Sequence, residues 1–198
     1  MDFYQQSTEF TGAPSALLMV IHHFDPEFQL TRQNEFLLWQ QTATLPIRAA
    51  SIYAMACVAK QHGIKVKVFV GNEDFDFPDY RFKGYTKKEI DYAGFMYNLH
   101  RKLAQQQGIS VVVKDFNVEE IKEAAQQGKI IMVRINIGIL REQKALSHYV
   151  VVYGYSKKAF LVIDPSEGQR LVTLPELQQA LDTLETKKKR DLRMLVFS

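Results

Sequence analysis

The most informative stretch of the chain is Gln6-Ser7-Thr8-Glu9-Phe10-Thr11-Gly12-Ala13-Pro14-Ser15-Ala16-Leu17-Leu18-Met19-Val20. Pro14 suits the first turn of a helix, because its fixed φ is helical and its missing N–H would have no partner there. Apolar residues then recur with helical spacing as far as Ile21, and the run His22-His23-Phe24-Asp25-Pro26 breaks the pattern. The stretch therefore predicts a short, mostly buried helix that starts at Pro14, with a polar segment leading into it.

Apolar periodicity predicts mainly helices in the first half of the chain and mainly strands in the second. Further helices are expected near residues 33–42, 49–61, 88–107, 118–127 and 174–184, with strands at 64–70, 109–113, 130–137, 149–155, 159–163 and 192–197. This order favours an α+β fold with a mostly antiparallel sheet over repeating βαβ units. Residues 75–84 mix aromatic and acidic side chains without a clear period, so we expect a packed surface loop or, alternatively, a lid.

Bulk composition indicates a single domain over residues 1–198. A chain of 198 residues that is 46% hydrophobic can bury one substantial core. Its 25 lysines and arginines nearly balance its 22 acidic residues, which argues against nucleic acid as a partner and against a basic membrane-binding surface. The basic run Lys187-Lys188-Lys189-Arg190 is typical of a solvated turn or helix end.

Several features predict a cytoplasmic protein without metal or other cofactors. Asp2 and other polar residues precede the first apolar run, which is the wrong order for a secretory signal. The longest apolar stretch, 16–21, is far too short to span a bilayer, so we expect no membrane insertion. The single cysteine, Cys57, excludes an internal disulfide and a thiolate zinc cluster, and its apolar helical setting predicts a buried small residue. The spacing typical of metal ligands is not found among four of the histidines, His22, His23, His62 and His100.

The second informative block is Leu146-Ser147-His148-Tyr149-Val150-Val151-Val152-Tyr153-Gly154-Tyr155, followed by Phe160-Leu161-Val162-Ile163-Asp164-Pro165. His148 opens one predicted strand and Asp164 closes the next, with a turn at Ser156-Lys157-Lys158 between them. In such a hairpin the Asp164 carboxylate can accept a hydrogen bond from Nδ1–H of His148, which leaves Nε2 free to act as a base. Taken alone, His148 is more typical of a satisfied, partly buried histidine, and Asp164-Pro165 of a turn.

Together, the two blocks resemble the papain-like cysteine peptidases that cut double-glycine leaders from bacteriocin precursors, the peptidase C39-like family. Those peptidases carry a Gln, a short spacer and Cys-Gly-Pro at the start of a helix, then a His that opens a buried strand and a strand that ends in Asp-Pro. The resemblance spans most of the chain and implies a papain-like fold, with N-terminal helices packed on a C-terminal, mostly antiparallel sheet. It also implies a site: His148 and Asp164 in catalytic positions, Gln6 in the oxyanion hole, and Gly12 at the position of the missing nucleophile.

Gly12 stands where the family has its cysteine, and Ala13 also departs from the family's glycine. Covalent acyl transfer needs a thiolate or an activated hydroxyl, and glycine supplies neither. The hydroxyls of Ser15 and Thr11 are poorly matched to a geometry built for residue 12, so a helix-facing serine and a capping threonine are the simpler roles. Two departures at neighbouring positions favour natural divergence over an engineered inactivation.

The sequence leaves three functions open. The favoured one is a catalytically inactive relative that binds a peptide or protein tail in the former active-site groove, as nucleophile-free leader-peptidase domains of some exporters do. The alternatives are a slow hydrolase in which His148 and Asp164 activate water, and a structural subunit in which this pair only braces the hairpin. Without a side chain at Gly12, we expect an open space beside backbone N–H groups, the Gln6 amide and a charged His148, which predicts a site for a chain-terminal carboxylate.

Overall fold

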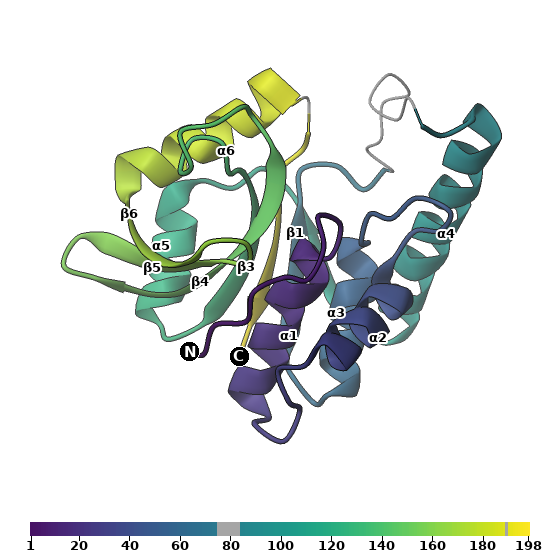
Figure 1. The fold of residues 1–198 in the computed structure, drawn as a ribbon, viewed down its shortest axis with the longest axis horizontal. Coiled ribbons are helices and arrows are strands. Elements are labelled where there is room, and N and C mark those ends of the chain that lie inside the picture. Colours follow the sequence, from purple (N-terminus) through teal and green to yellow (C-terminus); the bar gives the residue numbers. More distant parts are fainter. Residues whose placement is uncertain (75–83, 189) are drawn as a thin grey trace.

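The computed structural model describes residues 1–74, 84–188 and 190–198, in which helices pack on both faces of one sheet (Figure 1). The helices are α1 (Gly12–Phe24), α2 (Arg32–Thr42), α3 (Ile52–Gln61), α4 (Lys87–Gln106), α5 (Val118–Gln126) and α6 (Leu174–Lys188). The strands are β1 (Val66–Val70), β2 (Ser110–Val113), β3 (Ile130–Asn136), β4 (Ser147–Ser156), β5 (Ala159–Asp164), β6 (Gly168–Thr173) and β7 (Arg193–Phe197). The expected α+β architecture is therefore confirmed.

The strands form one sheet in the order β2-β1-β7-β3-β4-β5-β6. Within the described ranges β1 and β2 pair in parallel, and the other neighbouring strands pair antiparallel. The C-terminal strand β7 lies between β1 and β3. It thereby joins the pair β1 and β2 to the antiparallel strands β3 to β6. The prediction of a mostly antiparallel sheet is confirmed.

Each face of the sheet has its own hydrophobic core. On one face α1 and α3 bury side chains such as Leu17 and Met55 against Val151 of β4. On the other face α5 and α6 bury Leu181 and other apolar residues against Val150. Consecutive residues of β4 thus enter opposite cores, as expected for a strand that is covered on both faces. This burial fixes the backbone that carries His148.

Helix α1 extends beyond the predicted helix at both ends, because it begins at Gly12 and continues to Phe24. His22 remains helical because polar partners at the edge of the core satisfy its ring. Its Nδ1 lies 3.1 Å from the carbonyl oxygen of Phe28, and its Nε2 lies 3.3 Å from a carboxylate oxygen of Asp2. Asp25 is the C-cap residue, and its N–H donates to the carbonyl of Ile21.

Strand β6 has no counterpart among the predicted strands. Its apolar pair is Leu171, which is 69% exposed at the sheet edge, and Val172, which is buried. A short edge strand with one buried apolar side chain shows almost no alternation of apolar and polar residues, so its sequence pattern does not predict a strand. Helix α6 is longer than predicted and ends with Lys187 and Lys188 in its last turn, which fits a basic helix end.

The loop or lid predicted at 75–84 lies outside the described residues except for Gly84. In the part of the chain that the structure describes, none of the helices has the length and apolar character needed to cross a membrane. Cys57 is buried in α3, as predicted, and burial raises the pKa of its thiol.

Candidate functional site

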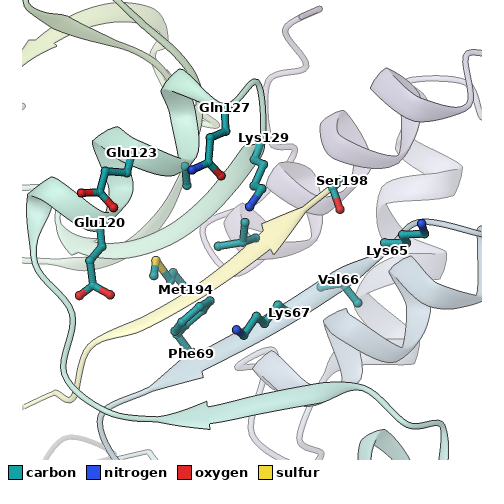
Figure 2. Close-up of a pocket in the computed structure, with 12 residues that line it drawn as sticks. Lys65, Val66, Lys67, Phe69, Glu120, Glu123, Gln127, Lys129, Met194 and Ser198 are labelled. Carbon is teal, nitrogen blue, oxygen red and sulfur yellow. The ribbon is translucent and has the colours of Figure 1, made fainter.

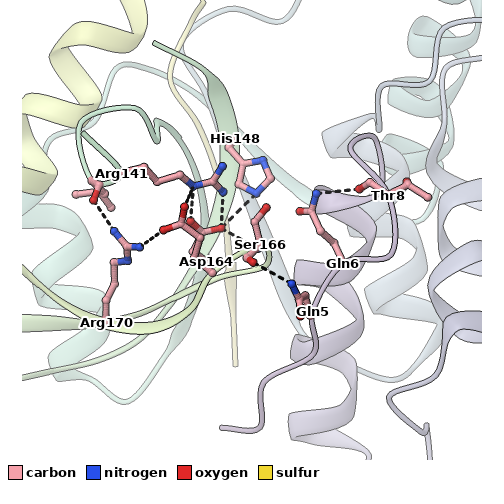
Figure 3. Close-up of polar contacts among 10 residues, drawn as sticks. Gln5, Gln6, Thr8, Arg141, His148, Asp164, Ser166 and Arg170 are labelled. Atoms are coloured by element: carbon pink, nitrogen blue, oxygen red, sulfur yellow. Dashed lines mark hydrogen bonds and ion pairs between the residues drawn. The ribbon is translucent and has the colours of Figure 1, made fainter. Parts of the chain in front are cut away.

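The four residues of the predicted site come together where α1 meets the sheet. Figure 3 shows Gln6, His148 and Asp164 among them. Gly12 is the first residue of α1, and Gln6 lies in the segment that leads into it. His148 lies near the start of β4 and Asp164 ends β5, and the predicted turn at 156–158 joins the two strands. The hairpin therefore brings His148 and Asp164 to the same end of the sheet, beside the start of α1.

The His148 ring occupies the space beside Gly12. A Cβ placed on Gly12 would lie 3.1 Å from Nδ1 of His148, 2.8 Å from Oε1 of Gln6, and in steric overlap with Cε1 of His148. A side chain at position 12 would thus require the imidazole to move. The expectation of an open space at Gly12 is wrong, because a residue without Cβ lets the ring lie against its backbone.

The two ring nitrogens of His148 face the opposite way from the prediction. Nε2 lies 3.6 Å from Oδ1 of Asp164, whereas Nδ1 is on the side of Gly12. The distance of 3.6 Å is beyond that of a hydrogen bond, and Nε2 has no hydrogen-bond partner among the described residues. Asp164 therefore does not orient the imidazole through a direct hydrogen bond.

Arg141 is the partner that Asp164 has instead. Its Nε donates to Oδ2 of Asp164 at 2.7 Å and its Nη2 donates to Oδ1 at 2.6 Å, as Figure 3 shows. The backbone N–H of Ser166 adds a bond of 2.9 Å to Oδ1. Asp164 is fully buried, and a bidentate guanidinium is the geometry that best compensates a buried carboxylate. Arg141 follows β3 in a segment without a motif, so no sequence pattern indicates this contact.

Burial sets the protonation states of the pair. For His148, burial is the largest influence and lowers the pKa to about 4, because Arg141 adds to the effect and Asp164 opposes it only in part. For Asp164, burial raises the pKa, but the hydrogen bonds from Arg141 and Ser166 outweigh it and hold the pKa below its ordinary value. The site at neutral pH thus holds a neutral imidazole and an ionised carboxylate, and the expected charged His148 is wrong.

The Gln6 side chain presents its oxygen, rather than its N–H, to Gly12. Nε2 of Gln6 donates to the carbonyl of Thr8 at 2.8 Å, and Oε1 is buried without a hydrogen-bond partner among the described residues. The Gln6 backbone N–H donates to the carbonyl of Pro165 at 2.8 Å, which fixes this segment against the end of β5. Gln6 is therefore adjacent to Gly12 as expected, but its donor points away from the place where an oxyanion would form.

Glu35 of α2 is a buried residue near the site that the sequence did not reveal. Its carboxylate accepts from the Ser7 N–H at 2.8 Å, the Ser15 hydroxyl at 2.8 Å and the Tyr4 hydroxyl at 2.9 Å. Burial raises its pKa, but hydrogen bonding from Ser7, Thr11 and Ser15 outweighs burial and holds the pKa below its ordinary value. The carboxylate thereby ties the segment before Gly12 to α1 and α2.

These contacts also define what the nearby hydroxyls do. Ser15 is buried and its hydroxyl donates to Glu35. Thr11 is the N-cap residue of α1 but makes no side-chain cap, because its hydroxyl lies 2.9 Å from the hydroxyl of Thr8. The capping role expected for Thr11 is thus wrong, while Ser15 is engaged away from His148.

A cavity of about 250 Å³ lies beside Gly12 and His148. Its wall includes small residues from α1 and the segment before α3, an exposed Glu9, and basic side chains from β3, the residues after α6 and β7. The basic residues are Arg134, Arg190 and Arg193. Arg190 was expected to be solvated with the lysines before it, but it is 9% exposed.

A second cavity, of about 400 Å³, lies between α5 and the sheet (Figure 2). Phe69 and Met194 lie on the sheet beneath it, while Lys67 and Glu120 lie at its sides. It contains none of the four predicted site residues and mixes positive with negative side chains. Across the described residues, no group of three or more His, Cys, Asp or Glu side chains is arranged to hold a metal ion. The cavity beside Gly12 is therefore the candidate site.

Comparison with known proteins shows the family and the fold of the chain. A family model described as the Peptidase_C39 like family matches residues 1–196. The chain belongs to this family. No curated protein sequence matches it. The fold that the two blocks implied is thus confirmed. This member of the Peptidase_C39 like family has a single cysteine, Cys57, and a glycine at position 12.

Two crystal structures show the same fold at low sequence identity. One is a double glycine motif protease from an AMS/PCAT transporter in complex with the leader peptide, with a TM-score of 0.54, 12% identity, and coverage of 99% of this chain and 89% of that one. The other is a C39-like peptidase from Bacillus anthracis, with a TM-score of 0.53, 11% identity, and coverage of 100% and 94%. At these identities the likeness concerns the fold of this family member, and function has to be argued from the site.

Proposed function

We propose that this protein is a peptidase-like binding protein without peptidase activity, which holds a peptide or protein tail in the groove beside Gly12 and His148. The observation that carries the proposal is the His148 ring in the place of a nucleophile's side chain. A peptidase of this fold needs a thiolate between the imidazole and the scissile bond. Here the imidazole lies against the backbone of Gly12 itself.

Two further features support inactivity. Neither nearby hydroxyl is poised for attack, because Ser15 is committed to Glu35 and Thr11 to Thr8. The amide of Gln6 turns its oxygen toward Gly12, so a developing oxyanion would lose a side-chain donor that contributes a few kcal/mol in enzymes that use one. The described geometry thus lacks both a nucleophile and the side-chain donor of an oxyanion hole.

Peptide binding is supported by the cavity and by the fold. The cavity of about 250 Å³ is bordered by the start of α1 and by β4, the same elements that carry Gly12 and His148. In the transporter protease with this fold, the crystal structure contains the leader peptide. A groove between the helices and the sheet that has lost its nucleophile retains the surface against which an extended chain can lie. The whole chain 1–198 is proposed to act as one such domain.

The water-activating hydrolase is less well supported. A pKa of about 4 makes His148 a weak base, and the 3.6 Å gap to Asp164 removes the hydrogen bond that would stabilise its protonated form. The purely structural role is also less well supported, because Arg141 rather than His148 satisfies Asp164. A brace made by His148 and Asp164 would need a direct hydrogen bond, but Nε2 of His148 lies 3.6 Å from Oδ1 of Asp164.

A titration of the wild-type chain with acetylated, amidated peptides that contain a double-glycine pair tests the proposal. The amide signals of Gly12 and His148 would be followed by NMR, with the exposed Gly84, which does not line the cavity, as an internal reference. We expect saturable shifts at Gly12 and His148 and none at Gly84, with every peptide intact afterwards. Shifts at none of the cavity residues with any peptide would rule out the binding function.

A further inference from the structure

Helix α4 has two apolar faces, one buried and one exposed. The buried face consists of Ala93, Tyr97, His100 and Ala104. It packs on α3, where the ring centroid of Tyr97 lies 5.2 Å from that of Tyr53. In Figure 1 α4 lies at the outer edge of the molecule, on the far side of α3 from the sheet. A helix in this position needs one apolar face for its own packing, so a second apolar face calls for an explanation.

The exposed face is an apolar stripe that extends over about three turns of α4. Its members are four large side chains that are 39–70% exposed: Tyr92, Phe95, Leu99 and Leu103. They follow one another at intervals of three or four residues, which places them on one side of the helix. A capping box fixes the start of α4. This α4 stripe is therefore presented to solvent on a well-ordered helix.

One flank of the α4 stripe has a charge of opposite sign at each end. Asp91 lies at the N-terminal end and Lys102 at the C-terminal end, and both are exposed. They lie on the same flank because the interval between them is about three turns of helix. Among the described residues, neither side chain forms an ion pair or a hydrogen bond. Both charges are thus available to a partner that covers the stripe.

The α4 stripe is complementary to itself when a second copy is turned end to end. In a two-fold pair, each contact between two different residues occurs twice, with the roles of the copies exchanged. An axis level with Tyr97 sets Phe95 opposite Leu99 of the second copy. The same axis brings Asp91 to Lys102 of the second copy, and Lys102 to Asp91. Apolar residues thus meet apolar residues, and each charge meets its opposite.

We propose that α4 forms an antiparallel, two-fold interface with α4 of a second copy of this chain. The stripe is the apolar centre of the interface, and two pairs of Asp91 with Lys102 form its polar rim. A single helix pair is smaller than a standard interface of about 800 Å² per partner, so the dimer is reversible, with a Kd on the order of 10–100 μM. The described residues that line the cavity beside Gly12 come from elements other than α4. The dimer therefore leaves both peptide grooves uncovered, and it does not depend on peptide binding.

Sedimentation velocity of the wild-type chain from roughly 2 to 500 μM tests the interface. We expect the sedimentation coefficient to rise from that of a monomer toward that of a dimer. Phe95→Glu places two charges at the apolar centre and is expected to weaken dimerisation at least tenfold. Leu171→Glu makes the same kind of change at a side chain that is 69% exposed on the sheet edge, and should change nothing. A wild-type chain that remains monomeric, or dimers that persist in Phe95→Glu, would overturn the proposal.

Two charge reversals test the antiparallel, two-fold arrangement. Asp91→Lys or Lys102→Asp alone sets like charges together at both ends of the interface, so each is expected to weaken dimerisation roughly fivefold at low ionic strength. An equimolar mixture of the two variants restores opposite charges at both ends and should associate at least as well as the wild type. Near-ultraviolet circular dichroism establishes that each variant is folded. A mixture that associates no better than its components would overturn the arrangement.

Discussion

The imidazole of His148 lies against the backbone of Gly12, in the space that a side chain at position 12 would occupy. Because residue 12 has no Cβ, the ring can approach its backbone closely. Burial also keeps the ring neutral by lowering its pKa to about 4. Residue 12 and residue 148 should therefore be coupled in stability as well as in position.

The first prediction concerns this coupling. Gly12→Ala is expected to lower the free energy of unfolding by about 1–3 kcal/mol, because the added Cβ overlaps the His148 ring. In a His148→Ala background, Gly12→Ala should lower the unfolding free energy by at least about 1 kcal/mol less than in the wild type, because the ring is absent. Urea unfolding of the four proteins measures the coupling. Gly84→Ala is the matched control, because no atom of the described residues lies within 4 Å of a Cβ placed there. Additive effects of Gly12→Ala and His148→Ala would contradict the close contact.

The second prediction concerns the buried pair of Arg141 and Asp164. Arg141→Ala leaves a fully buried carboxylate without its bidentate partner, so we expect a loss of about 3–5 kcal/mol in unfolding free energy. Arg101→Gln breaks an ion pair with Glu73 that is much more exposed, and should cost less than about 1 kcal/mol. Chemical denaturation compares the two. Similar small losses in both variants would mean that Arg141 does not compensate Asp164.

The third prediction concerns the pH dependence caused by His148. Its pKa in the folded chain, about 4, is below the value of 6.5 expected when unfolded, so the unfolded chain binds the proton more readily. The stability contribution of the neutral ring is complete above pH 6.5 and is lost as the pH falls toward 4. The unfolding free energy of the wild type relative to His148→Asn should be constant above pH 6.5 and should decrease as the pH falls toward 4.

A control separates His148 from other histidines that titrate over the same range. Burial also lowers the pKa of His100, so a His100→Asn variant shows how much of the slope belongs to that residue. The imidazole signals of His148 can be followed directly by NMR as acid is added. Protonation of His148 near pH 6.5 would refute both the buried environment and the pH dependence.

The fourth prediction concerns Glu35 and the segment that carries Gln6. Glu35→Gln keeps the shape of the side chain but loses the charge that accepts from Ser7, Ser15 and Tyr4, so we expect a loss of about 1–3 kcal/mol. Hydrogen exchange at the Ser7 amide should also accelerate, because its bond to the carboxylate weakens. Glu27→Gln at an exposed position is the control. Unchanged exchange at Ser7 would show that Glu35 does not fix this segment.

The sequence predicted those parts of the fold that depend on local patterns. The helix opened by Pro14 and the β4–β5 hairpin follow from apolar periodicity and turn residues, and the resemblance brought Gln6, Gly12 and His148 into one site. Arg141 and Glu35 could not be predicted, because the partner of a long polar side chain is set by tertiary packing. The orientation of the His148 ring depends on the absent Cβ at residue 12, and no sequence pattern records it.

The most direct test of the central claim is mass spectrometry of a pool of double-glycine peptides after incubation with the wild-type chain. Gly12→Cys and Gly12→Cys/His148→Ala serve as matched comparisons, since they return the thiol with and without the imidazole. A binding protein that has lost its nucleophile should leave every peptide intact in the wild-type sample while still retaining peptides on the folded chain. Fragments produced by the wild type, and lost in His148→Ala, would contradict this account and show that the site still hydrolyses peptides.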